Sequence, residues 1–88
     1  QAAVRSVSIT PNPAQTSATL TLDSDEEGIC EVQIISVTGI TLKQYSTRLV
    51  AAKQEIVLTD LESLPSGMYE VLVKRDGIIV EQTKLIIE

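Results

Sequence analysis

Residues Leu64 to Glu88 read LPSGMYEVLVKRDGIIVEQTKLIIE, and this stretch decides the fold. Two runs rich in apolar and β-branched residues flank the dipeptide Asp76-Gly77. A two-residue hairpin loop of type I′ needs positive φ at both central residues, and Asp-Gly accepts that conformation readily. The stretch therefore predicts a turn, a strand, a tight hairpin loop and a second strand that runs to Glu88.

The second strand of this hairpin does not alternate cleanly between apolar and polar side chains. Neither face is wholly apolar between Ile78 and Glu88, which predicts a β-bulge near Gln82 to Lys84. The run Leu85-Ile86-Ile87 then places apolar side chains on both faces of a strand that ends the sequence. Such an edge is either covered by another strand or a parent domain, or it is a docking edge for another protein. Pairing of the last strands in an edge-strand dimer of the isolated chain is a further expectation.

Five strand-like runs separated by turn residues precede the hairpin, at residues 4–9, 17–23, 29–35, 40–45 and 54–59. Their alternation predicts that these side chains, with three from the hairpin, face a core: Val7, Ile9, Ala18, Leu20, Leu22, Cys30, Val32, Ile34, Ile56, Leu58, Tyr69, Val71 and Val73. Ser46 to Lys53 reads as a polar connection, and Asp60 to Leu64 as one helical turn with Asp60 as its cap. Seven strands without a helical period indicate an all-β fold, most simply an immunoglobulin-like antiparallel β-sandwich of about seven strands.

Tyr69 fits the same fold. It follows a Leu-Pro-x-Gly turn and opens the penultimate strand, where immunoglobulin-like domains carry a tyrosine corner. We therefore expect Tyr69 to have a structural role that outweighs any role in ligand binding.

Composition excludes several classes of function. The chain has 88 residues, which suits one small domain, and its net charge of −5 argues against nucleic acid and anionic membranes as partners. It has no His and one Cys, and no catalytic set, phosphate loop or metal cluster is evident, so we expect no enzyme activity, no cofactor and no metal. The Asp-x-Asp-x-Glu-Gly spacing of Asp23 to Gly28 resembles the start of a calcium loop, but Ile34 stands where the bidentate acid is needed. Two tyrosines leave little for stacking sugars, which makes a carbohydrate-binding module remote.

Four motifs occur in order along the chain: Pro11-Asn12-Pro13-Ala14, the turn at Thr38-Gly39, Leu61-x-x-Leu64-Pro65-x-Gly67-x-Tyr69, and Lys84-Leu85-Ile86. In their order, spacing and terminal position the chain resembles the C-terminal sorting domain of proteins exported by the type IX secretion system of Bacteroidetes. The resemblance covers essentially Val7 to Glu88. It implies a seven-stranded immunoglobulin-like domain at the end of a larger secreted cargo protein, with residues 1–5 as a linker from the cargo and residues 6–88 as the sorting domain.

The resemblance also implies a function. Such a domain is an address read by outer-membrane components of the export machinery, and a sortase-like surface peptidase then removes it, with attachment of the cargo to the cell surface. Cleavage would fall before or near Gln1 to Val4, and the protein would pass through the periplasm to the cell surface or the medium, without inserting into the membrane itself. Carried over by position, the recognition residues are Pro11, Asn12, Pro13, Gly67, Tyr69, Lys84, Leu85 and Ile86. The alternative is an adhesin-like or fibronectin-like accessory module of a surface protein.

Overall fold

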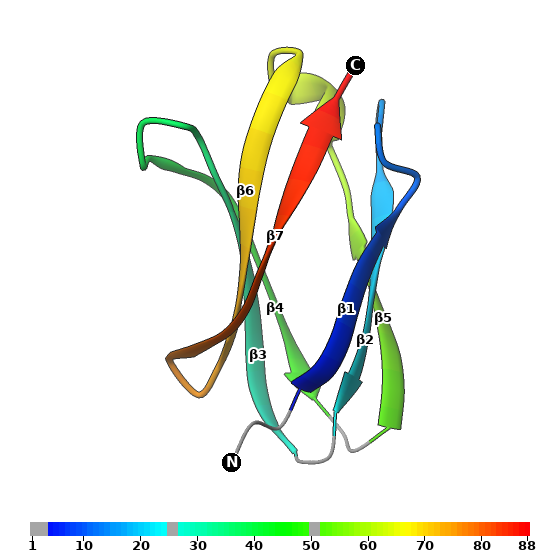
Figure 1. Cartoon of the computed structure of the whole chain (residues 1–88), viewed down its shortest axis with the longest axis vertical. Coiled ribbons are helices and arrows are strands. Elements are labelled where there is room, and N and C mark those ends of the chain that lie inside the picture. The colour runs from blue at the N-terminus through cyan, green and yellow to red at the C-terminus, as the bar shows by residue number, and fades with distance from the viewer. Residues whose placement is uncertain (1–3, 25–26, 50–51) are drawn as a thin grey trace.

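Seven strands form two antiparallel sheets that pack as a β-sandwich (Figure 1). The structure, a computed structural model, describes residues 4–24, 27–49 and 52–88. One sheet has the strand order β1-β2-β5 and the other β4-β3-β6-β7. The elements are β1 (Val4–Thr10), β2 (Ala18–Ser24), β3 (Gly28–Ile35), β4 (Thr41–Leu49), β5 (Ala52–Leu58), the 3₁₀ helix η1 (Leu61–Ser63), β6 (Gly67–Arg75) and β7 (Ile78–Ile87). The predicted all-β sandwich is confirmed. Among the described residues, no helix has the length and apolar character of a membrane span.

The core lies between the sheets and is built from aliphatic side chains of alternate positions. Leu20 and Leu22 of β2 face Val32 and Ile34 of β3, and all four side chains are fully buried. Because strand side chains alternate between faces, each strand supplies every second residue to this layer. All but one of the predicted core residues are buried, and Val7 is half-buried against the same cluster.

Cys30 is part of this core. Its side chain is 1% exposed, and burial raises the pKa of its thiol, with the neighbouring Glu31 carboxylate adding to the effect. A thiol held in its neutral form is a poor nucleophile, so Cys30 acts as a small core side chain, as predicted.

The hairpin between β6 and β7 turns as predicted. Asp76 and Gly77 have φ of 52° and 85°, the positive values that a type I′ loop requires. Asp76 also fixes the loop to β3: its backbone N–H donates to the Ile29 carbonyl oxygen over 2.9 Å, and its Oδ1 accepts from the Ile29 N–H over 2.9 Å. The loop that joins β6 and β7 is therefore also hydrogen-bonded to β3.

The bulge in β7 is nearer the hairpin loop than predicted. The pairing passes from Val73–Glu81 to Lys74–Ile79, so Val80 is the extra residue, and the expected position at Gln82 to Lys84 is wrong. Val80 packs against the core, whereas Ile79 beside it is exposed, so the bulge turns one apolar side chain inward at the base of the hairpin. Regular pairing with β6 then continues to Ile87.

Two local predictions between β4 and β6 are wrong. The described residues of the segment Ser46 to Lys53 are in strands rather than in a connection, because β4 continues to Leu49 and β5 begins at Ala52. Polar side chains stand there because β4 and β5 are edge strands with one face in solvent. The predicted helical turn is present as η1, but Asp60, which stands at its N-cap position with φ of 62°, makes no side-chain capping hydrogen bond.

The Asp60 carboxylate instead accepts a hydrogen bond from Lys43 Nζ at 2.7 Å, and this bond raises the pKa of Lys43. On the same side of the sandwich, the Tyr45 hydroxyl donates to the Thr59 carbonyl oxygen over 2.8 Å, and burial raises the pKa of Tyr45. These contacts connect β4 to the end of β5. The segment Asp23 to Gly28, which resembles the start of a calcium loop, includes residues 25 and 26, and these lie outside the described residues.

Candidate recognition site

The loop between β1 and β2 lies along the outer edge of β7, at the end of the sandwich opposite the Asp76-Gly77 hairpin (Figure 1). The Ala14 N–H donates to the Ile86 carbonyl oxygen over 2.8 Å, and the Ala14 carbonyl oxygen accepts from the Glu88 N–H over 2.9 Å. This pair of bonds makes Ala14 a parallel bridge partner of Ile87, and the Ala14 side chain is fully buried. The loop is thus anchored in the core as well as to the strand.

Asn12 extends the same contact towards the middle of β7. Its Nδ2 donates to the Lys84 carbonyl oxygen over 3.0 Å, and its Oδ1 accepts from the Ile86 N–H over 3.0 Å. Pro11 and Pro13 flank it and carry no N–H of their own. We call the segment Pro11–Ala14 together with Lys84–Glu88 the clasp.

Of the two alternatives for the terminal edge, covered or open for docking, the structure supports the covered one from Lys84 to Glu88, although the cover is a loop of the same chain and not another strand or a parent domain. The edge of the terminal strand from Lys84 to Glu88 is not free, because the Pro11–Ala14 segment of the same chain covers it. Covering by the chain itself is one of the ways in which proteins prevent edge strands from pairing with other chains. Docking through this part of β7 must therefore use side chains, and the edge-strand dimer stays a prediction.

The other predicted recognition residues lie next to the clasp in β6. Gly67 pairs with Ile87, and Tyr69 pairs with Leu85. The Tyr69 hydroxyl donates to the Pro65 carbonyl oxygen, which confirms the predicted tyrosine corner. The structure thus brings all eight predicted residues to one end of the sandwich, although the first and last of them are more than seventy residues apart in the sequence.

These eight residues differ in accessibility. Tyr69 is 6% exposed and Leu85 is fully buried, so both belong to the framework. The other six residues are exposed and accessible to a partner: Pro11, Asn12, Pro13, Gly67, Lys84 and Ile86. Gly67 has φ of 154°, at the limit of the region that side chains avoid.

Met68 is a member of this surface that the sequence reasoning missed. It pairs with Ile86 across the sheet, and the two side chains are 50% and 42% exposed on the outer face. The signal was present in the sequence, because an inward Tyr69 places Met68 outward. Contiguous exposed apolar surface marks protein contact sites, and Met68 enlarges the apolar area that Ile86 presents.

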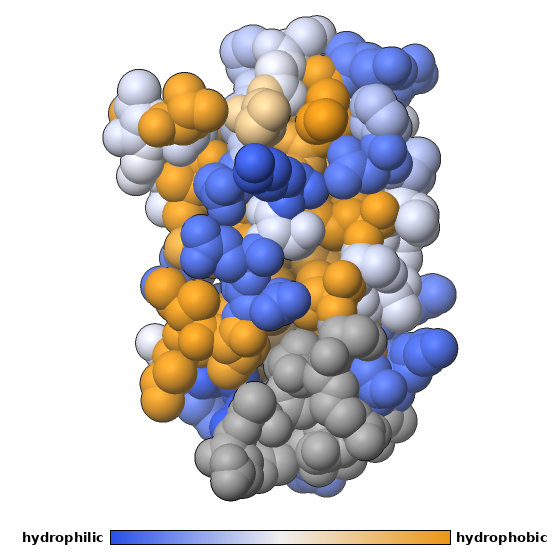
Figure 2. All heavy atoms as spheres, in the orientation of Figure 1, coloured by the Kyte–Doolittle hydropathy of each residue, from blue (hydrophilic) through white to orange (hydrophobic). Residues whose placement is uncertain are grey.

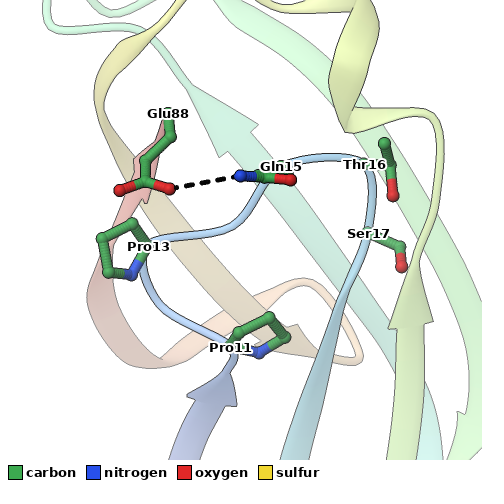
Figure 3. A pocket seen from close by; sticks show the side chains of 6 residues that line it. All are labelled: Pro11, Pro13, Gln15, Thr16, Ser17 and Glu88. Atoms are coloured by element: carbon green, nitrogen blue, oxygen red, sulfur yellow. Dashed lines mark hydrogen bonds between the residues drawn. The ribbon is translucent and has the colours of Figure 1, made fainter.

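Two hollows lie on the surface of the described residues, and the first of them borders the clasp. One, of about 430 Å³, is a bowl between the Pro11–Ser17 loop and the end of β7, where Gln15 Nε2 donates to Glu88 Oε1 over 3.5 Å (Figure 3). The other, of about 400 Å³, lies on the outer face of the four-stranded sheet beside the β3–β4 turn, and the following residues line it: Ile35, Ser36, Val37, Gly39, Glu70, Leu72 and Gln82.

The β3–β4 turn adds apolar surface to this region. Gly39 has φ of 92°, and Val37 and Ile40 in the turn are 80% and 60% exposed. Figure 2 shows apolar atoms on the projecting turn, and a second apolar area lies lower on the same face, near the β6–β7 hairpin. In the part of the chain that the structure describes, no three His, Cys, Asp or Glu side chains are grouped as a metal site would need.

Comparison with models of protein families shows which family the chain belongs to. The family model of the secretion system C-terminal sorting domain matches residues 8–88. The chain belongs to this family. The match covers all eight predicted recognition residues, and it supports a type IX secretion sorting signal that takes its cargo across the outer membrane to the cell surface or the medium.

Comparison of this sorting domain with curated proteins finds no significant match. Among solved structures, it resembles part of the GH3 β-glucosidase of Bifidobacterium adolescentis, with a TM-score of 0.55, 18% identity, and coverage of 97% of this chain and 17% of that one. It also resembles part of the alkylpurine DNA glycosylase AlkC of Pseudomonas fluorescens, solved with abasic-site DNA, with a TM-score of 0.54, 18% identity, and coverage of 98% and 30%. At this identity the likeness shows the sandwich fold alone, and the chain spans less than a third of either protein.

Proposed function

We propose that this sorting domain is the address of a larger cargo protein, and that the export machinery reads it at the clasp. The observation that carries the proposal is the convergence of three separate motifs at one end of the sandwich. Asn12 of the first motif bonds the backbone of the last, and Tyr69 of the middle motif pairs with Leu85. A packing role alone would not require an exposed Ile86 and Met68 beside them.

Exposure divides the proposed address into two parts. Lys84 and Ile86 on β7, with the rings of Pro11 and Pro13, are open to direct contact with an outer-membrane component of the type IX system. Tyr69 and Leu85 act indirectly, because they hold β6 and β7 in place from within the core. An acidic domain with exposed apolar side chains at one end fits a protein partner that combines apolar and basic surface.

After export, we propose that a sortase-like surface peptidase removes the domain near Gln1 to Val4 and attaches the cargo to the cell surface. The strand β1 begins at the hairpin end of the sandwich, opposite the clasp (Figure 1). The peptidase and the export component would therefore act on separate parts of the domain.

The experiment appends this chain to a folded reporter that carries a signal peptide, in a bacterium with a type IX system. We expect the reporter at the cell surface or in the medium, and mass spectrometry of its new C-terminus should place the cut near Gln1 to Val4. Retention of the reporter in the periplasm, at the level of a reporter without the chain, would contradict the sorting role. An exported reporter that keeps the domain would contradict only the processing step.

Deletion of Lys84 to Glu88 is a poor test of the same idea. It removes Leu85 and Ile87, which are 0% and 2% exposed, so the truncated domain loses core packing as well as the address. Point variants of exposed residues separate recognition from folding.

A further inference from the structure

The bonds of Asn12 follow the pattern of a parallel β-ladder. In such a ladder, a residue donates its N–H to the residue before its partner and accepts from the residue after it. Ala14 does this with its backbone, donating to Ile86 and accepting from Glu88. Asn12 makes the equivalent pair two residues earlier, with Lys84 and Ile86, but it uses its side-chain amide.

The side chain substitutes for a backbone because of its chemistry. A carboxamide carries one carbonyl oxygen and N–H donors in a plane, as a peptide group does. The outward groups of β7 that it satisfies are a carbonyl oxygen and an N–H, so a side chain with only donors or only acceptors would leave one of them without a partner. Together, Asn12 and Ala14 satisfy four backbone groups at the end of the chain: the carbonyl oxygens of Lys84 and Ile86 and the N–H groups of Ile86 and Glu88.

We propose that Asn12 is a positioning residue of the sorting signal: its carboxamide acts as a strand backbone that holds Lys84 to Glu88 in the conformation the partner reads. This inference rests on the proposed function for its biological consequence. Asn12 thereby acts through Lys84 and Ile86, and the partner reaches β7 from the outer face, where these two side chains are exposed.

The test compares Asn12→Ala and Asn12→Asp with the unaltered chain by amide hydrogen exchange. Asn12→Ala removes both bonds. Because each bond contributes about 1 kcal/mol, protection of the Ile86 amide should fall about thirtyfold. The Val32 amide in β3 is the reference, and its protection should change far less. Unchanged protection of the Ile86 amide in Asn12→Ala would overturn the proposal.

Asn12→Asp adds a readout that a merely structural role would not move. Above the carboxyl pKa, the aspartate has no donor for the Lys84 carbonyl oxygen, and the two oxygens repel each other. Below it, the protonated carboxyl has one O–H donor and one acceptor and can restore both bonds. Protection of the Ile86 amide, taken relative to the unaltered chain at the same pH, should therefore be low at pH 7 and recover near pH 3. Equal relative protection at both pH values would contradict the amide-mimic role.

Export of the reporter fusion separates this inference from the proposed function. Asn12→Ala should lower export and Ile86 protection together. A loss of export with full Ile86 protection would mean that the partner touches Asn12 directly, which overturns the positioning role and leaves the sorting role standing. If the fusion with the unaltered chain is not exported, the sorting role fails, and the exchange experiment still decides what Asn12 does to β7.

Discussion

Replacement of Tyr69 by Phe tests whether this residue is framework or address. Tyr69 is 6% exposed, and its hydroxyl donates to the Pro65 carbonyl oxygen across the turn that enters β6. Tyr69→Phe keeps the buried ring and removes one hydrogen bond. We expect the free energy of unfolding to fall by about 1 kcal/mol, because a neutral intramolecular hydrogen bond contributes about that much.

That loss is small against the stability of the whole domain. At roughly 0.05–0.15 kcal/mol per residue, a domain of this length has about 4–13 kcal/mol, so Tyr69→Phe should remain folded. Its Tm should fall by about 4–8 °C for each kcal/mol lost. Tyr69→Ala would also empty the ring site, at about 3–5 kcal/mol, and would bring the domain close to unfolding.

The assay is urea unfolding followed by far-ultraviolet circular dichroism, with Tyr45→Phe as the matched control. The Tyr45 hydroxyl also donates to a backbone carbonyl oxygen, that of Thr59, but at the opposite, more exposed side of the sandwich. Tyr45→Phe should therefore cost less than Tyr69→Phe, and both variants should export the reporter normally. A Tyr69→Phe domain of unaltered stability that fails to export would refute the framework role, because its hydroxyl would then belong to the contact surface.

Three further predictions follow from burial, turn geometry and thiol chemistry. Leu85→Ala should cost about 2–5 kcal/mol in urea unfolding because its side chain is fully buried, and a cost below about 1 kcal/mol would contradict its core position. Asp76→Ala puts a residue without a polar side chain at φ of 52° and removes the bond to the Ile29 N–H, so it should lower the free energy of unfolding by about 1–3 kcal/mol. Asp76→Asn should lower it by less. Equal losses in the two variants would argue against the turn geometry as the cause. Cys30 should resist a thiol reagent in native buffer at pH 8 and react fully in urea, and rapid native labelling would contradict its burial. Because burial raises the folded-state pKa of Cys30, its contribution to stability is complete below the unfolded pKa and is lost as the pH rises through the raised folded-state pKa.

The sequence predicted those parts of the fold that depend on local chemistry. Asp76-Gly77 selects its turn through backbone conformation alone, and the alternation in β2 and β3 places Leu20 and Val32 in the core without any tertiary information. The sequence predicts a polar connection from Ser46 to Lys53 where the described residues are strand, because the exposed faces of edge strands carry polar residues, as connections do. The position of the bulge could not be read, because Val80 turns inward through contact with the core.

The candidate site was predicted as a set of residues but not as an arrangement. Family resemblance supplied Asn12 and Lys84, yet nothing local in the sequence says that a side-chain amide of one bonds the backbone of the other. That contact depends on the packing of the two sheets, which brings the edge strands β1 and β7 side by side (Figure 1). Ala14 became part of the site for the same reason, since its burial is a tertiary property.

The most direct test of the sorting account compares Ile86→Thr with Val57→Thr in the exported reporter fusion. Both residues are exposed apolar side chains on strands, 42% and 55% exposed, but Ile86 lies in the clasp and Val57 lies on the other sheet. Neither change should alter stability by more than about 0.5 kcal/mol. The account predicts that Ile86→Thr lowers surface delivery about tenfold, as expected when a central contact residue is lost, while Val57→Thr leaves it unchanged. Equal delivery by the two folded variants would contradict recognition at the clasp.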